Sequence, residues 1–244
     1  MAGSTQSLED LNARIVRCER CGRLRPYCAE VARVKRKAYA NFEYWGRPVP
    51  SFGDAQARVL LLGLAPGAHG SNRTGRMFTG DGSGNFLFPV LHDAGFASQA
   101  KAAARDDGMK LNDAWISAVV RCAPPGNKPT PEELRNCAPW LDEEMGLLRK
   151  LRVVVCLGKI AFDGFLGHQL RAGKLTTRAG FTFGHGTEYA LPDGLTLIAS
   201  YHPSLQNTNT GKLTRAMFLA VFMRARAKAG LGAMNAVYEE RDGQ

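Results

Sequence analysis

The sequence has neither a long hydrophobic run nor a hydrophobic start. No apolar stretch approaches the roughly 18 residues that a membrane-spanning helix needs. The first residues, MAGSTQSLED, lack the basic and apolar regions of a secretion signal. We therefore expect a protein without a membrane association that works in the cytoplasm, where thiols stay reduced.

Acidic residues are scarce relative to basic ones. The 244 residues include 22 Asp and Glu against 32 Lys and Arg, which gives a formal net charge of +10 and a pI near 9.6. This excess suits a polyanionic partner such as nucleic acid or a membrane surface, and a basic surface without a function is the alternative. Hydrophobic residues make up 45% of the chain, so residues 1–244 are expected to form a single domain.

Cysteine is also infrequent, at six residues. In a reducing compartment these thiols are expected to bind metal or to be buried rather than to form disulfides. Cys18 and Cys21 form a CERC pair, and Cys137 follows Cys122 by 15 positions, so four thiolates are available for zinc or for a 4Fe-4S cluster. Spacing does not separate these two, and a CERC pair with the other thiols merely buried is a third alternative. Cys28 is an alternative ligand, but it has no close partner in the sequence and is left out of the set.

The hydrophobic pattern alternates between strands and helices. Short apolar runs predict strands at 57–64, 113–122, 151–158 and 195–203. Helical patterns are found at 84–95, 131–149, 159–166 and 211–230. Apolar strands separated by helices indicate an α/β fold, a three-layer α/β/α sandwich with a central parallel sheet covered on both faces. We assign residues 51–230 to this core and residues 1–50 to an N-terminal segment that carries the first cysteines.

Two loops that follow predicted strands have an unusual composition. The stretch GLAPGAHGSNRTGRMFTGDGSGNF, which starts at Gly63, contains six glycines after its proline but one carboxylate, Asp81. The stretch SYHPSLQNTNTG starts at Ser200, in the last predicted strand. Ligands of open α/β sheets bind beyond the carboxyl ends of the strands, so we expect both loops to line one crevice.

Several motifs resemble the uracil-DNA glycosylase superfamily, in particular its iron-sulfur branch, family 5, of bacteria and archaea. They are GLAPGAHGSNRTGRMFTGD, RCAPPGNKPTPEE, YHPSLQNTNTGKLT and the order and spacing of the four cysteines. The resemblance extends from Cys18 to Leu219. It implies a 4Fe-4S cluster on Cys18, Cys21, Cys122 and Cys137, which makes residues 1–50 a cluster-binding segment. It also implies a monomer whose partner is DNA with deaminated bases, at the nucleoid.

The resemblance places substrate-binding groups in both loops. An enzyme that excises a base must extrude the nucleotide, hold the base in a pocket and stabilise the charges that develop on base and sugar. Phe78 is the candidate platform on which the base stacks, and a position in the hydrophobic core is the alternative. The other candidates contact the substrate or its flanking phosphates through a hydroxyl or the glycine-rich backbone, and they are Ser204, Gly63, Ala65, Pro66 and Gly67.

Three further side chains are candidates for catalysis. His202 is expected to donate a hydrogen bond to the base carbonyl on which anionic charge develops. Relatives have a polar residue in the first motif to position the attacking water, whereas this chain has the apolar Leu64 and Ala65. Asp81 is therefore expected to orient water or to stabilise the positively charged sugar, with a turn residue as the alternative. Asn127 is expected either to assist or to be only a turn residue.

One amide is missing from the expected pocket. In the related iron-sulfur branch an Asn four residues before the third cysteine reads the edge of uracil, and this position is Ala118 here. A site built on hydrogen bonds rejects wrong partners better than one built on shape. We therefore expect hypoxanthine to be excised in addition to uracil.

Together these features predict a monofunctional DNA glycosylase that uses water and no lysine Schiff base. Basic residues are expected to contact phosphates and make DNA affinity salt-dependent, and they are Arg73, Arg76, Lys212, Arg215, Arg224 and Arg226. One alternative is a catalytically silent nucleic-acid-binding module with the same fold. Another is a small-molecule hydrolase that binds phosphate with the glycine loop.

Overall fold

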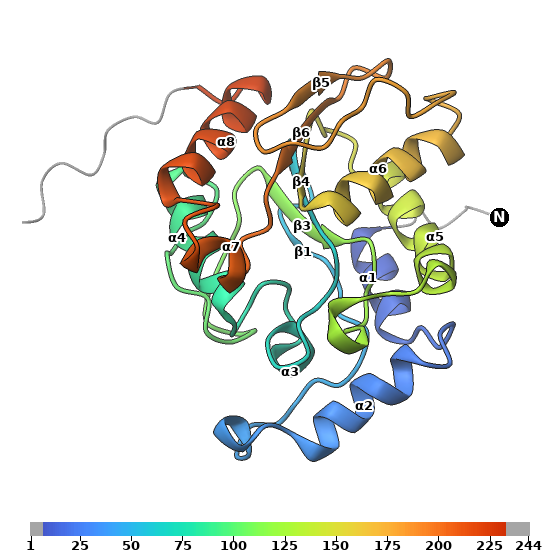
Figure 1. Cartoon of the computed structure of the whole chain (residues 1–244), viewed down its shortest axis with the longest axis vertical. Helices are drawn as coiled ribbons and strands as arrows, with labels where there is room; N and C mark the ends of the chain where they lie inside the picture. Colours follow the sequence, from blue (N-terminus) through green and yellow to red (C-terminus); the bar gives the residue numbers. More distant parts are fainter. Residues whose placement is uncertain (1–6, 233–244) are drawn as a thin grey trace, which may run out of the picture.

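The computed structural model describes residues 7–232, and a twisted sheet runs through its centre (Figure 1). The strand order is β1-β3-β2-β4-β6-β5. The strands are β1 Phe52–Gly53, β2 Val59–Gly63, β3 Ala114–Ala118, β4 Val153–Leu157, β5 Glu188–Ala190 and β6 Thr196–Ser200. The inner strands β3, β2, β4 and β6 pair in parallel, whereas β1 and β5 add antiparallel edges.

The four inner strands confirm the predicted strands and the central parallel sheet, to which β1 and β5 add antiparallel edges that the sequence did not predict. β1 and β5 are two and three residues long, which is too short for a recognisable hydrophobic pattern in the sequence. The predicted strand 113–122 is also too long, because β3 ends at Ala118 and the chain turns away toward Cys122.

Helices cover both faces of the sheet, which confirms the three-layer sandwich. Leu61 of β2 packs in one core cluster with residues of α4 Gly82–Asp93 and α8 Arg215–Lys228. Leu60 and Leu62 of the same strand point to the other face, toward α1 Leu8–Val16, α5 Pro131–Leu147 and α6 Lys159–Arg171. Both faces of the strand are fully buried, as the parallel inner strands of such a sheet require. No helix in the described part of the chain is long and apolar enough to cross a membrane.

Short elements complete the edge where the parallel strands end. They are α2 Leu24–Val34, the 3-10 helix η1 Lys37–Tyr39, α3 Ser71–Thr74, the 3-10 helix η2 Pro125–Asn127 and α7 Leu205–Asn209. Two predicted helix bounds differ by more than two residues. α8 begins after the N-cap Thr214 rather than at 211, and α6 extends to Arg171 instead of ending at 166.

A buried ion pair joins the end of β3 to α5. The Arg121 guanidinium donates to Glu144, with 2.7 Å between Nη2 and Oε2, and both side chains are almost fully buried. The carboxylate also accepts hydrogen bonds from the Trp115 indole at 2.9 Å and from the Ser117 hydroxyl. Ser51 contacts both charged groups. The Glu144 charge is thus compensated on every side, in a place where an unpaired charge is very unfavourable.

We expect Glu144→Ala to destabilise the fold by about 3–5 kcal/mol, because it leaves the Arg121 charge buried without its partner. Denaturant unfolding monitored by circular dichroism measures this loss. Glu30→Ala is the matched control, since Glu30 pairs with Arg33 in an exposed i,i+3 salt bridge and should change stability little. Equal effects of the two substitutions would contradict a structural role for the buried pair.

Candidate active site

A pocket of about 490 Å³ opens at the carboxyl ends of the strands, where the sequence predicted a crevice. β2 contributes Gly63, β3 contributes Ala118, and the loop after β6 contributes His202. The starts of α4 and α7 close the sides. Of the predicted site residues the lining includes Gly63, Ala65, Gly67, Phe78, Asp81, Asn127, His202 and Ser204. Pro66 is not part of this lining, because its side chain is buried in the loop.

Phe78 is both a core residue and a wall of the pocket. Its side chain is 8% exposed and belongs to the core cluster beneath α4 and α8. Its backbone has φ +52°, an uncommon conformation for a residue with a side chain. The ring lies 5.9 Å from the His202 ring, at an interplanar angle of 31°. A Cβ on Gly63 would lie 3.0 Å from the Phe78 ring, so glycine lets the strand end pass close beneath it.

His202 is held neutral by burial. The pKa of its imidazole is lowered to about 4 because the surrounding protein removes it from water. Its backbone carbonyl accepts a hydrogen bond from the Asn207 amide at 2.8 Å. No other described residue hydrogen-bonds to its ring nitrogens, which leaves them to the pocket. A neutral imidazole in this position can donate one hydrogen bond without carrying charge.

Asp81 combines a structural role with a place in the pocket. It is the N-cap of α4, and its Oδ1 accepts a hydrogen bond from the Gly84 backbone N–H at 3.0 Å. A Cβ on Gly67 or Gly70 would lie 3.0 or 2.0 Å from its Oδ2, so the loop folds against the carboxylate only with glycine there. Burial raises the pKa of Asp81, and the backbone N–H groups of Gly84 and Ser83 oppose this rise. A structural role and a catalytic role of Asp81 are therefore physically compatible, because Oδ1 caps the helix while the side chain also lines the pocket.

Two other candidates stand at the rim. Asn127 is exposed, with φ +57° in the turn η2, so it has the backbone of a turn residue and also lines the pocket. Ser204 is the N-cap of α7, where its hydroxyl accepts a hydrogen bond from the Asn207 N–H. The hydroxyl proton of Ser204 stays available to a ligand.

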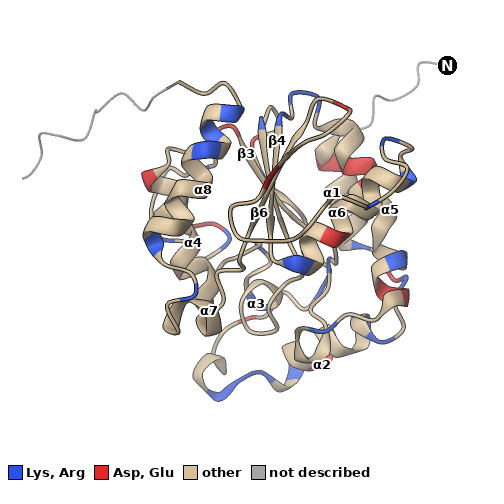
Figure 2. Cartoon of the chain, turned by 45° about the horizontal axis from the view of Figure 1, so that its top comes forward, with Lys and Arg blue, Asp and Glu red and all other residues tan. Residues whose placement is uncertain are grey.

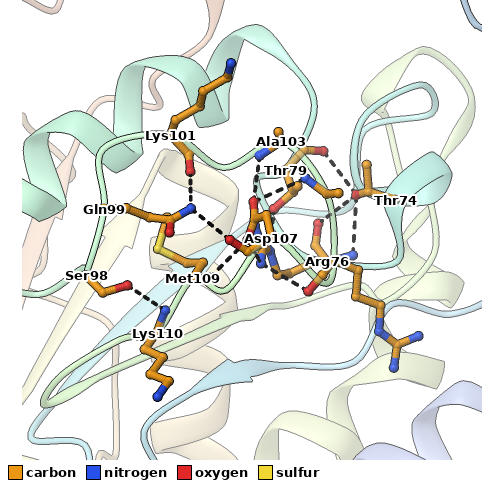
Figure 3. A network of polar contacts seen from close by, with 12 residues as sticks. Thr74, Arg76, Thr79, Ser98, Gln99, Lys101, Ala103, Asp107, Met109 and Lys110 are labelled. Carbon is orange, nitrogen blue, oxygen red and sulfur yellow. Dashed lines mark hydrogen bonds and ion pairs between the residues drawn. The ribbon is translucent and has the colours of Figure 1, made fainter.

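The prediction that Arg73 and Arg76 contact DNA phosphates is wrong, because both side chains are buried and hydrogen-bonded within the protein. Arg73 donates to the His69 and Gly80 carbonyls, both at 2.8 Å. Arg76 forms a two-pronged pair with Asp107, at 2.7 Å for each nitrogen (Figure 3). These arginines stabilise the glycine-rich loop through contacts within the protein.

The four basic residues predicted to bind DNA in the C-terminal part lie at two different places, the start and the end of α8. Arg224 and Arg226 lie near the end of α8, and Figures 1 and 2 place this end on the opposite side of the molecule from α3 and α7. Arg224 donates to the Gly186 carbonyl there. Lys212 lies just before α8, with its ammonium 4.8 Å from the centre of the Tyr201 ring. Arg215 pairs with Asp93 at the start of the helix. Of these four residues, Lys212 is nearest in the sequence to a pocket residue, since it follows His202 by 10 positions.

Leu205 is a feature of the pocket that the sequence reasoning missed. It occupies the first position of α7, lines the pocket and is 58% exposed. Its side chain rests on Gly82, where an added Cβ would lie 2.7 Å from it. The only sequence signal was an apolar residue directly after a helix cap, where a polar residue is usual.

The four predicted cysteine ligands come from separate segments of one region. Cys18 and Cys21 lie between α1 and α2, Cys122 follows β3, and Cys137 lies on α5. All four border the same hydrophobic cluster. Burial raises the pKa of Cys137 to about 11, and the charges of Cys18 and Cys21 act in the same direction, so the three sulfurs are neighbours. Cys28, which the sequence reasoning left out, is buried beside Cys122, and its thiol donates to the Ala123 carbonyl.

Two donors point at these sulfurs. The Arg121 backbone N–H donates to Cys137 Sγ at 3.2 Å, and the Asn136 amide approaches Cys21 Sγ at 3.9 Å. Hydrogen bonds to sulfur are a usual feature of thiolate ligation of iron-sulfur clusters. In the described chain no three His, Cys, Asp or Glu side chains form a group that can hold a single metal ion.

Comparison with known proteins agrees with this geometry. A chain from Thermus thermophilus described as a type-5 uracil-DNA glycosylase is 54% identical over 215 residues, which cover 88% of this chain and 94% of the relative. One from Mycobacterium tuberculosis with the same description is 46% identical over 232 residues, which cover 95% and 85%. The family profile described as Uracil DNA glycosylase superfamily matches residues 50–226, from the edge strand β1 to the end of α8. By fold, by pocket and by sequence, this chain belongs to the uracil-DNA glycosylase superfamily.

Proposed function

We propose that this protein hydrolyses the N-glycosidic bond of uracil and other deaminated bases in DNA and so initiates base excision repair. The observation that carries this proposal is a half-buried carboxylate and a neutral imidazole that line one pocket, Asp81 and His202. The high identity to proteins described as type-5 uracil-DNA glycosylases supports it. The pocket is built within one chain, so a monomer suffices, and the substrate places the enzyme at the chromosomal DNA in the cytoplasm.

The base is held between a ring and a hydrogen-bond donor. An extruded base stacks on Phe78, whose ring forms one wall, and one of its carbonyl oxygens meets the His202 imidazole. As the glycosidic bond breaks, negative charge accumulates on that oxygen. A donor fixed in a site from which water is excluded stabilises such charge more than it stabilises the neutral base.

Water is the nucleophile in this mechanism. Asp81 accepts a hydrogen bond from the water, orients it toward the sugar carbon and stabilises the positive charge that develops on the sugar. The apolar Leu64 and Ala65 line the pocket but offer no side-chain acceptor, so the task falls to Asp81, with Asn127 at the rim to assist. The lining of the pocket includes no lysine that could form a Schiff base. The products are the free base and an abasic site.

Leu205 supports the extrusion of the nucleotide. An exposed apolar side chain at the mouth of the pocket can enter the base stack and fill the gap that the departing nucleotide leaves. The rigid N-terminus of α7 holds it in place, because Ser204 caps that helix.

The floor of the pocket favours a broad range of bases. Ala118 ends β3 with a methyl group where an amide would pair with the base edge, so shape and the His202 contact select the substrate. We propose that the purine hypoxanthine is therefore excised together with uracil.

The four predicted cysteines fit a 4Fe-4S cluster. We propose that Cys18, Cys21, Cys122 and Cys137 hold it, because a cysteine-rich donor set with N–H groups directed at its sulfurs is the chemistry that such clusters require. The cluster supplies a covalent tie between residues 1–50 and α5. Cys28 remains as a thiol beside Cys122.

Excision of uracil tests the function directly, and Asp81→Asn tests the mechanism. The variant should slow single-turnover excision about a hundredfold or more while DNA binding stays nearly intact, because Asn keeps both the shape and the helix cap but loses the charge. The wild-type rate should rise with pH through the raised pKa of Asp81 and then level off, and the variant should lack this rise. His202 becomes charged only near and below pH 4, so the comparison of wild type with Asp81→Asn separates its contribution from that of Asp81.

Strand cleavage at uracil after alkaline treatment of the abasic product is the assay. No cleavage by wild type, together with tight DNA binding, would favour the silent binding module. Full activity of Asp81→Asn on every substrate would make Asp81 only a helix cap.

Ala118→Asn tests the base range. An amide at the end of β3 can pair with the edge of uracil, so the ratio of excision rates for uracil over hypoxanthine should increase at least tenfold. Ala118→Ser, which adds a smaller polar group, is the size control. An unchanged ratio in Ala118→Asn would show that Ala118 does not face the base.

Metal analysis of protein purified without oxygen tests the cluster. We expect iron and acid-labile sulfide together with the broad visible absorption of a 4Fe-4S cluster, and Cys137→Ser should lose all of them. Cys156→Ser, in the buried strand β4, is the matched control and should keep the iron. One zinc per chain without iron would contradict the proposal.

A further inference from the structure

A strongly basic loop follows α2 on the side of the molecule where the pocket opens. The basic sequence RVKRK begins with Arg33 and Val34 in the last turn of α2 and continues into this loop, so its four cations are Arg33, Lys35, Arg36 and Lys37. Arg33 pairs with Glu30 of α2, and the Lys35 ammonium donates to the Ala40 carbonyl. The side chains of Arg36 and Lys37 are exposed and form no hydrogen bond or ion pair with another side chain or carbonyl among residues 7–232. Figure 2 shows the succession of basic segments on this loop.

The loop is fastened to the wall of the pocket. The Arg73 guanidinium of α3 lies 4.2 Å from the Tyr39 ring centre and 5.0 Å from that of Phe42. The same guanidinium donates to the His69 and Gly80 carbonyls of the glycine-rich loop, and Tyr44 Oη lies 3.0 Å from His69 Nδ1. Both Figure 1 and Figure 2 show the loop beside α3. The cations therefore have a fixed position relative to the pocket.

Exposed apolar groups accompany the cations. Val34 and Phe42, at the two ends of the loop, are 62% and 51% exposed. Leu205 at the pocket rim is another exposed apolar side chain on this side. Cations interleaved with exposed apolar and aromatic side chains are typical of surfaces that bind a nucleic-acid backbone and its bases or sugars.

We propose that residues 33–42 form a second DNA contact, which binds the duplex backbone on one flank of the extruded nucleotide. Arg36 and Lys37 contact phosphates, and Phe42 and Val34 lie against the adjacent sugars. This inference rests on the proposed function and adds to it a contact outside the base pocket. In this proposal Arg73 does not contact DNA itself but holds the loop that does.

The position of the loop determines its effect on kinetics. The loop does not line the base pocket, so it contributes equally to ground-state and transition-state binding. Loss of its charges should weaken DNA binding without slowing the bound complex. Because each phosphate contact releases counterions, it should also lower the salt dependence of binding.

The test compares Arg36→Gln/Lys37→Gln with Arg149→Gln/Lys150→Gln. Arg149 and Lys150 are exposed and directly precede β4, so they lie at the amino ends of the parallel strands, whereas the pocket lies at the carboxyl ends. The control variant removes the same number of charges as the loop variant. We expect the loop variant to bind an unmodified duplex on the order of tenfold more weakly. Its slope of log affinity against log salt should be smaller by about 1–2. Its maximal single-turnover rate on a uracil duplex should equal that of wild type.

Duplexes shortened on the 5′ or the 3′ flank of the uracil locate the contact. The defect of the loop variant should disappear on one of the two shortened duplexes, because wild type then loses the same contact. If wild type excises uracil and binds DNA with a steep salt dependence, but the loop and control variants behave alike, the second contact is wrong and the proposed function stands. If wild type neither binds nor cleaves DNA, the proposed function itself fails. Weakened binding to an acidic peptide with DNA binding unchanged would assign the loop to a protein partner and overturn the proposal.

Discussion

The pocket depends on the close approach of one carboxylate to a glycine-rich backbone. Asp81 Oδ2 occupies the space that a Cβ of Gly70 would need, while Oδ1 caps α4. This contact closes the loop between β2 and α4 on itself and buries the carboxylate at the same time. Burial raises its pKa, which in the proposed mechanism makes it a better acceptor for the attacking water than an exposed aspartate. Folding and chemistry thus rest on the same contact.

Buried arginines maintain this arrangement from outside the pocket. Arg73 joins the two ends of the loop through the His69 and Gly80 carbonyls, and Arg76 ties it to Asp107. On the other face of the sheet, the buried ion pair of Arg121 and Glu144 joins the end of β3 to α5 in the region of the cysteines. The high arginine content that suggests a DNA-binding surface is therefore partly used inside the protein. A buried guanidinium satisfies several carbonyl or carboxylate groups at once, which no other side chain does as well.

The N-terminal residues extend the site in two directions. Cys18 and Cys21 bring this segment against α5, and the loop after α2 brings cations beside α3. The first part of the chain thereby joins the cysteine region to the mouth of the pocket. We infer that a cluster at these cysteines would hold the basic loop in its place as well as the segment itself.

The sequence by itself determined the inner strands, the covering helices α4, α5, α6 and α8 and many residues of the pocket, but neither α1 nor α2. Short buried strands and capped helices leave local patterns, and Asp81, His202 and Phe78 stand in motifs that follow strand ends. It did not determine the edge strands, which are too short for a pattern, or the role of Leu205, whose exposure depends on the packing of α7. The contacts of Arg73 with the Tyr39 and Phe42 rings, of Arg76 with Asp107 and of Cys28 with Cys122 join segments far apart in the chain. Charge and residue type are local properties, whereas burial and pairing arise only when the tertiary structure brings distant segments together.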